Sequence, residues 1–175
     1  MTVDAETLKA MIEAEVATLS DARVVTHILS MLVEPHVVLR GWDYGTPGQQ
    51  YPCWNVLNDS SHSGAVIAYC EFGFEPKCPW GLVGSGTAPA DSQMGMDSGW
   101  FSSFLDAYFE SYAASGLPIW KVFRQEADLT LVQLTPEGTW ENTWNRLAEL
   151  RSSDPAGRYL CDHSISYGTP SKMER

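Results

Sequence analysis

The sequence predicts an α+β protein with a single antiparallel sheet of about six strands and with helices packed mainly on one face of that sheet. Two helical segments precede a run of short strand-like segments, and a helix, two strands and a further helix follow. Strands linked by short loops pair as antiparallel neighbours, which disfavours a parallel doubly wound sheet. The length of 175 residues is typical of one domain, and a hydrophobic fraction of 44% is sufficient for a core. We therefore expect a single domain over residues 1–175.

The predicted N-terminal helical pair covers residues 1–35. In its first helix, apolar residues recur at three- and four-residue spacing, which aligns them on one face. Asp4 is suited to cap that helix, and Ser20 and Asp21 mark a break before the second helix. We expect the second helix to end at Pro35, because proline interrupts the hydrogen bonds of a helix.

The predicted strand meander covers residues 36–84. β-branched and aromatic residues gather there in four short runs, which clusters of Gly, Pro, Asn and Ser separate. The four runs are residues 37–44, 52–57, 64–72 and 79–84. Turn-forming residues at 45–50 and 58–64 predict hairpin loops.

A long loop is predicted at residues 85–98, where large side chains are few and turn-forming residues are many. A third helix should begin near Asp97 or Ser98 and run to about Ser115, because aromatic and apolar residues recur there at helical spacing. Gly116 is a stop signal for this helix.

Two strands and a fourth helix complete residues 99–154. The two strands are residues 118–124 and 128–134. The helix should open at Thr135, or a few residues later at Thr139. The tail, residues 155–175, is weakly patterned, although residues 158–167 have the composition of an edge strand.

The charge balance restricts the classes of partner. The chain has 22 acidic and 11 basic residues, which gives a formal net charge of −11. Because phosphate-rich surfaces repel carboxylates, we expect neither a nucleic acid nor an anionic membrane as a partner. The acidic N-terminus does not resemble a signal peptide, and no apolar run of about 18 residues occurs. These features predict a cytoplasmic protein.

The acidic charge and the aromatic residues coincide in one segment. Residues 41–110 contain eight acidic residues and one basic residue, Lys77, together with 13 of the 20 Trp, Tyr and Phe residues. Exposed aromatic side chains anchor protein partners, and carboxylates attract basic ones. The predicted contact residues are Trp42, Asp43, Tyr44, Asp59, Glu71, Glu75, Asp91 and Asp97. We expect a protein-binding module for a basic partner, in particular a bacterial immunity or inhibitor protein that occludes the active site of a toxin or effector.

Two alternatives remain open from the sequence. A small enzyme or carbohydrate-binding protein could use Glu71 and Glu75, because paired carboxylates perform acid–base chemistry and indole rings bind sugars. A metal-supported scaffold could use a set of three cysteines and one histidine. That set is Cys70, Cys78, Cys161 and His163. The cysteines lack the closely spaced pairs of structural zinc sites, so we expect no metal and no cofactor. The P-loop, GxSxG and HExxH motifs do not occur, and we assign no catalytic residue.

Overall fold

The computed structural model describes residues 3–58, 66–71, 77–84, 93–95 and 99–168, and it has the α+β architecture expected from the sequence. The chain folds into two compact units. The larger unit consists of residues 1–114 and 167–175, and the smaller unit of residues 115–166. The expectation of one domain over the whole chain stays a prediction.

Two helices open the larger unit, α1 (Ala5–Val16) and α2 (Ala22–Met31). The side chain of Asp4 accepts a hydrogen bond from the Thr7 backbone N–H at 2.8 Å, and this bond caps α1. Asp21 caps α2 in the same manner, through the backbone N–H of Arg23 at 2.9 Å. As the sequence predicts, α1 has both an apolar face and a capping aspartate at its N-terminus.

The second helix ends at Met31 and not at the expected position, Pro35. The chain passes directly into strand β1 (Leu32–Trp42), because Leu32 already has an extended ψ of 139°. A proline disfavours the helical conformation of the residue before it, so Pro35 excludes Glu34 from a helix as well. Pro35 itself is buried within the strand.

The larger unit contains a six-stranded sheet with the order β5-β1-β2-β3-β4-β6. The further strands are β2 (Gln50–Asn58), β3 (Val66–Tyr69), β4 (Trp80–Val83), β5 (Gln93–Met94) and β6 (Trp100–Phe101). Neighbouring strands are antiparallel except β1 and β5, which are parallel. β5 lies inside the segment for which the sequence predicts a loop throughout. The loop expected at 58–64 lies, apart from Asn58, outside the described residues.

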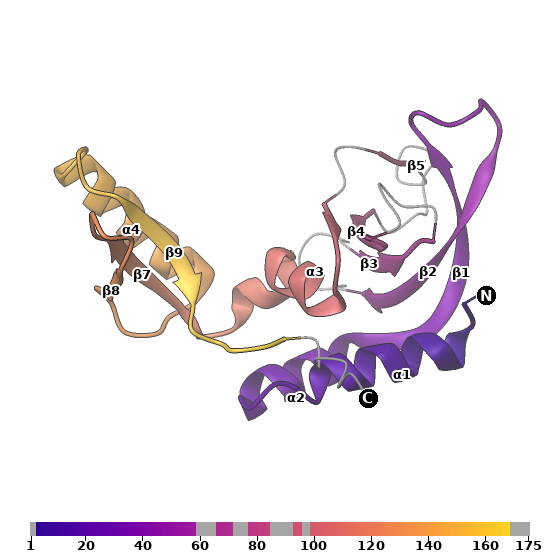
Figure 1. The fold of residues 1–175 in the computed structure, drawn as a ribbon, viewed down its shortest axis with the longest axis horizontal. Coiled ribbons are helices and arrows are strands. Elements are labelled where there is room, and N and C mark those ends of the chain that lie inside the picture. Colours follow the sequence, from indigo (N-terminus) through magenta and orange to yellow (C-terminus); the bar gives the residue numbers. More distant parts are fainter. Residues whose placement is uncertain (1–2, 59–65, 72–76, 85–92, 96–98, 169–175) are drawn as a thin grey trace. The chain divides into compact units, whose positions relative to one another are not determined.

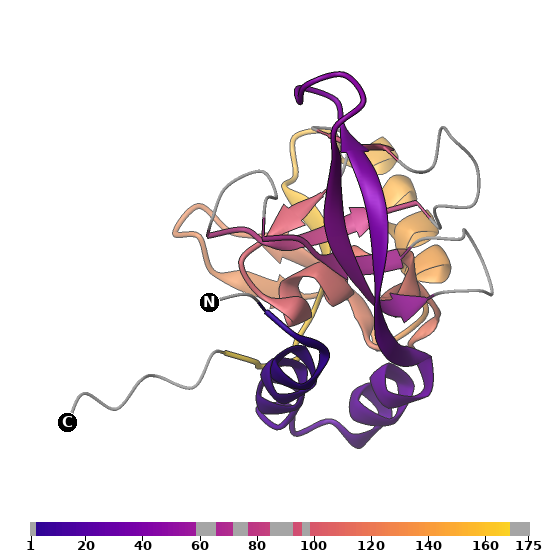
Figure 2. The same cartoon turned by 90° about the vertical axis from the view of Figure 1, so that its right-hand side faces the viewer.

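The hairpin between β1 and β2 turns at the position that its sequence indicates. Thr46 O accepts a hydrogen bond from Gln49 N at 2.9 Å, and Gly48 has a φ of +81°. Proline at the second and glycine at the third position are the pattern of a type II turn, which Pro47 and Gly48 satisfy. The β1–β2 ribbon rises from α1 and α2 to this turn (Figures 1 and 2).

The third helix, α3 (Phe104–Glu110), is shorter than the helix expected from Asp97 or Ser98 to Ser115. β6 occupies the preceding residues, and Ser103 then caps α3 by accepting a hydrogen bond from Asp106 N at 3.0 Å. Ser111 has an extended ψ of 159°, which ends the helix before a 3₁₀ turn, η1 (Tyr112–Gly116). α3 packs on the sheet, where Phe104 meets the buried Trp80 edge to face at 5.5 Å.

The smaller unit has its own sheet, with the order β8-β7-β9. It comprises β7 (Trp120–Gln125), β8 (Leu131–Gln133), α4 (Trp140–Ser153) and β9 (Tyr159–His163). The expected single sheet is thus two sheets, because β7 pairs with β8 and β9 and not with the strands of residues 32–101. α4 lies against β7 and β9, with Leu147 buried and Thr143 Oγ1 donating to Trp120 O at 3.2 Å. Within the described ranges, no helix is long and apolar enough to cross a membrane.

Candidate partner-binding surface

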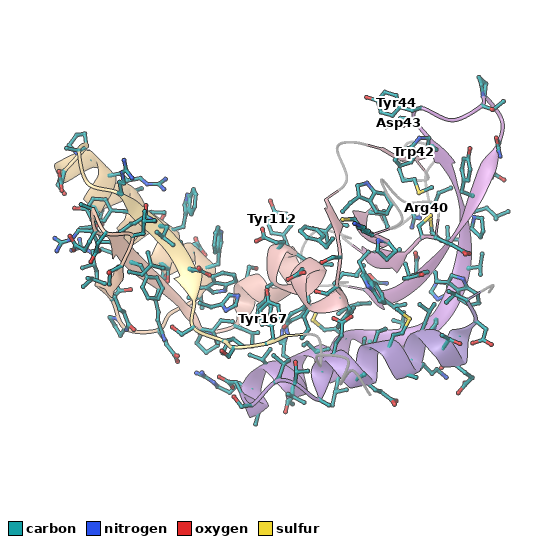
Figure 3. The ribbon with its side chains drawn as sticks, in the orientation of Figure 1. Arg40, Trp42, Asp43, Tyr44, Tyr112 and Tyr167 are labelled. Carbon is teal, nitrogen blue, oxygen red and sulfur yellow. The ribbon has the colours of Figure 1, made fainter. Side chains whose placement is uncertain are left out.

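Three predicted contact residues lie together where β1 ends. Trp42 is the last residue of β1 and pairs with Met94 of β5. The backbone N–H of Asp43 donates to Met94 O at 3.0 Å, and the N–H of Gly45 donates to Trp42 O at 2.8 Å. These bonds hold Trp42, Asp43 and Tyr44 at one end of the sheet, as Figure 3 shows, with Arg40 further down the same strand.

A second tryptophan completes this surface. The ring of Trp100 in β6 lies edge-on to the ring of Trp42, with centroids 6.1 Å apart. Trp100 Nε1 donates to the carbonyl oxygen of Gly95 at 3.0 Å. Tyr44 lies beside Trp42 at 6.3 Å and is 69% exposed, whereas the two tryptophans are half-buried. We name Trp42, Asp43, Tyr44, Gly95 and Trp100 the Trp42 surface.

Two glycines permit the close packing of this surface. A Cβ atom on Gly81 of β4 would lie 2.7 Å from Cζ3 of Trp100, so the indole ring rests directly on the glycine backbone. A Cβ atom on Gly95 would lie 2.6 Å from Cγ of Asp43. The ring and the carboxylate are thus both placed against backbone that carries no side chain.

The other predicted contacts are not brought to this surface by any described contact. Glu71 is an exposed residue in a turn after β3. Asp59, Glu75, Asp91 and Asp97 lie outside the described residues. Sequence reasoning missed Gly95 and Trp100 as site residues. Trp100 is one of the 13 aromatic residues of the segment 41–110, but its contact with Trp42 depends on strand pairing, which the periodicity of the sequence does not predict.

The charge of the larger unit is strongly negative. Its sequence holds fifteen acidic and six basic residues, a formal charge of −9, whereas the smaller unit carries −2. Arg23 pairs with Asp21 at 2.6 Å, and this hydrogen bond lowers the pKa of the Asp21 carboxyl to about 2.

Two more basic residues of the larger unit, one in α1 and one in β1, also have partners within that unit. Lys9 lies 2.7 Å from Glu34 and 3.3 Å from Glu6. Arg40 is fully buried, and its Nη2 donates to Asn55 Oδ1 at 3.3 Å. Lys9 is therefore paired with acids of its own unit, whereas Arg40 donates to a neutral amide.

The three cysteines and one histidine of the metal alternative are divided between the units. Cys70 and Cys78 belong to the larger unit, and Cys161 and His163 belong to the smaller one. In the part of the chain that the structure describes, no three His, Cys, Asp or Glu side chains form a group that could hold a metal ion.

Cys161 and His163 are adjacent on one face of β9, but their protonation does not favour nucleophilic chemistry. Burial raises the pKa of the Cys161 thiol to about 11, and it lowers the pKa of the His163 imidazole. Both groups are therefore neutral near pH 7, whereas an activated thiol needs a thiolate. Since Glu75 lies outside the described residues, the hypothesis of a Glu71–Glu75 carboxylate pair stays a prediction.

Comparison with protein-family models, with curated proteins and with solved structures found no match for this chain.

Proposed function

We propose that this protein is an acidic binding module that captures a basic protein partner at the Trp42 surface. One observation carries the proposal: Tyr44 is 69% exposed beside Trp42 and next to the exposed residue Asp43, in a unit with a formal charge of −9. Trp and Tyr are enriched in binding hot spots, and a carboxylate beside them is complementary to a basic partner.

The chemistry of these side chains suits arginine or lysine. A guanidinium or ammonium group is attracted to the face of an indole or phenol ring, and the attraction increases when water is excluded. A nearby carboxylate adds a charge-assisted hydrogen bond, which for arginine can be bidentate. Trp100 supports Trp42, which in turn lies beside the ring of Tyr44, so the exposed group needs little ordering when a partner binds.

The net charge would contribute mainly to the rate of association. Carboxylates distributed over the larger unit steer a cationic partner toward it, and salt screens this attraction beyond about 8–10 Å. Binding should therefore weaken as the ionic strength rises.

Within this class, we infer a bacterial immunity or inhibitor protein of the cytoplasm. The active site of a toxin or effector that acts on nucleic acid is itself basic, and an acidic surface with aromatic anchors can occlude it. The Trp42 surface supplies both elements of such an inhibitor.

The test is affinity capture of a partner from the native host by the immobilised full-length chain, with the captured proteins identified by mass spectrometry. The test variants are Tyr44→Ala and Asp43→Asn. The matched controls are Tyr112→Ala, at a tyrosine of the same unit that is 65% exposed, and Glu13→Gln, at an exposed acid of α1. Truncation of a hot-spot residue should reduce capture by at least about tenfold.

We expect the wild type and both controls to retain a protein rich in Lys and Arg that elutes as salt is raised. We expect the two test variants to lose it. Capture of a protein that is not basic, elution that ignores salt, or equal losses in test and control variants would each contradict the proposal.

A further inference from the structure

Two of the four cysteines face each other inside the larger unit. Antiparallel pairing joins Trp54 of β2 to Tyr69, the last residue of β3, so continuing this register sets Cys53 opposite Cys70, the residue directly after β3. Directly opposed residues of antiparallel strands have Cα atoms about 4.5–5.5 Å apart, which lies within the range of about 4.4–6.8 Å that a disulfide requires. Both thiols are buried in one cluster.

We propose that Cys53 and Cys70 are a redox site, at which two thiols close a disulfide between β2 and the end of β3 in exchange with a small-molecule disulfide such as oxidised glutathione. The alternation of side chains along a strand supports this assignment, because both cysteines lie on the face of the sheet that carries Val66, Ala68 and Met94. The bond can therefore form without a change of register.

The surroundings of the pair should slow its oxidation while the two thiols stay buried. Cys53 Sγ donates to the sulfur of Met94 at 3.3 Å. A hydrogen bond with the Cys70 thiol, followed by burial, raises the pKa of the Cys53 thiol far above its usual range, although Arg40 acts in the opposite direction. Since the thiolate is the attacking species, exchange must wait for an opening of the cluster.

The aromatic side chains that pack against the buried cysteines include residues of the Trp42 surface. Trp42, Tyr51 and Trp100 pack against the buried residues around the two thiols. Movement of these aromatic rings would admit a small disulfide, so the rate of oxidation reports on the opening of the Trp42 surface. The proposed redox chemistry does not depend on the proposed function, because it needs no protein partner.

The exchange balances in two steps. In the first, one cysteine thiolate attacks a sulfur of oxidised glutathione, forms a mixed disulfide and releases one glutathione thiolate, which takes up a proton. In the second, the other cysteine loses its proton and attacks the protein sulfur of the mixed disulfide, and a second glutathione leaves. The protein loses two electrons and two protons, and one molecule of oxidised glutathione becomes two molecules of glutathione.

The other two cysteines provide an internal comparison. Cys161 lies in the smaller unit opposite Val122 of β7, so the register of that sheet gives it no cysteine to pair with. Cys78 precedes β4 and is half-buried. Because Tyr69 pairs with Trp80, the register of β3 with β4 sets Cys78 beside Glu71 and not opposite Cys70, so we expect neither Cys78 nor Cys161 in the crosslink.

The test equilibrates the full-length protein in glutathione buffers of stepped redox ratio, followed by acid quenching, unfolding and alkylation with N-ethylmaleimide. A second arm unfolds the reduced protein and refolds it in the same buffers, so that access to the buried thiols does not limit the result. We expect a form that takes up two alkyl groups where the reduced protein takes up four, and a peptide in which Cys53 is joined to Cys70. The Cys78→Ser variant should keep this peptide, and the Cys53→Ser variant should lose it.

Three outcomes would overturn the proposal: four alkyl groups in both arms, stable glutathione adducts at Cys53 or Cys70 without a crosslink, or a crosslink that includes Cys78 or Cys161. Should the Cys53→Ser variant fail to fold, the peptide map of the wild type decides the question alone.

Discussion

Replacement of Gly81 by alanine should destabilise the larger unit by displacing the ring of Trp100. The added Cβ atom would lie 2.7 Å from Cζ3 of that ring, which is too close to persist, and 3.0 Å from Cη2 and 3.1 Å from Cε3, so the ring has to shift. Moving the ring loses the hydrogen bond to Gly95 O, worth about 1 kcal/mol, and the edge contact with Trp42, worth roughly 0.5–1.5 kcal/mol.

Alanine also lowers the conformational entropy of the unfolded chain. This stabilises the folded state by about 0.4–1 kcal/mol where alanine can adopt the native backbone conformation. The φ of Gly81 is not positive, so this gain applies. We expect a net loss of about 1–2 kcal/mol in the free energy of unfolding.

The assay is a double-mutant cycle with Trp100→Ala, in which circular dichroism monitors unfolding by urea. In the Trp100→Ala background the ring is absent, so Gly81→Ala should become neutral or slightly stabilising, with a coupling of roughly 1–3 kcal/mol between the two sites. Gly168→Ala is the control, because this glycine belongs to the same unit and an added Cβ atom there meets nothing within 4 Å. Equal costs of Gly81→Ala in both backgrounds, or a cost no larger than that of Gly168→Ala, would refute the packing of Trp100 on Gly81.

Two further predictions concern the contacts of α3. Burial raises the pKa of Glu15, which accepts a hydrogen bond from Leu105 N at 3.0 Å, so its stabilising effect is complete below the unfolded pKa and is lost as pH rises through the folded one. In thermal melts between pH 4 and 7, the melting temperature of Glu15→Gln should therefore rise relative to that of the wild type as the pH increases. A difference in melting temperature that does not change with pH would count against this. Tyr167 stacks on Phe109 at 4.9 Å and donates to Asp106 Oδ1 at 3.1 Å. In urea unfolding, Tyr167→Phe should cost about 1 kcal/mol and Tyr167→Ala about 1 kcal/mol more, and equal costs would show that the stacking contributes nothing.

Elements that local sequence specifies were predicted well. The cap at Asp4, the break between helices at Asp21 and the turn within residues 45–50 are local signals, and each is satisfied by a hydrogen bond within three residues. The third helix was predicted too long, because aromatic spacing suggested a helix before Ser103. Trp100 and Phe101 instead form strand β6, because pairing with β4 satisfies the backbone hydrogen-bonding groups of these residues.

The candidate site was only partly accessible to sequence reasoning. Trp42, Asp43 and Tyr44 are consecutive, so a concentration of acidic and aromatic residues was enough to select them. Trp100 and Gly95 join them through the pairing of β1 with β5 and of β4 with β6. These pairings join segments far apart along the chain, and no periodicity of either segment reveals the partner.

The sequence by itself determined the α+β class, the start of the first helix, the tight hairpin turn and the excess of acidic residues in the segment that forms the larger unit. These features depend on residue types and on spacing over a few positions, which local hydrogen bonds and side-chain direction translate directly into structure. Only the tertiary structure decided that the strands form two sheets, that Trp100 supports Trp42, and that Cys53 faces Cys70. Strand order and register are chosen by the burial of whole faces of a sheet, and that free energy belongs to the assembled unit and not to any one segment.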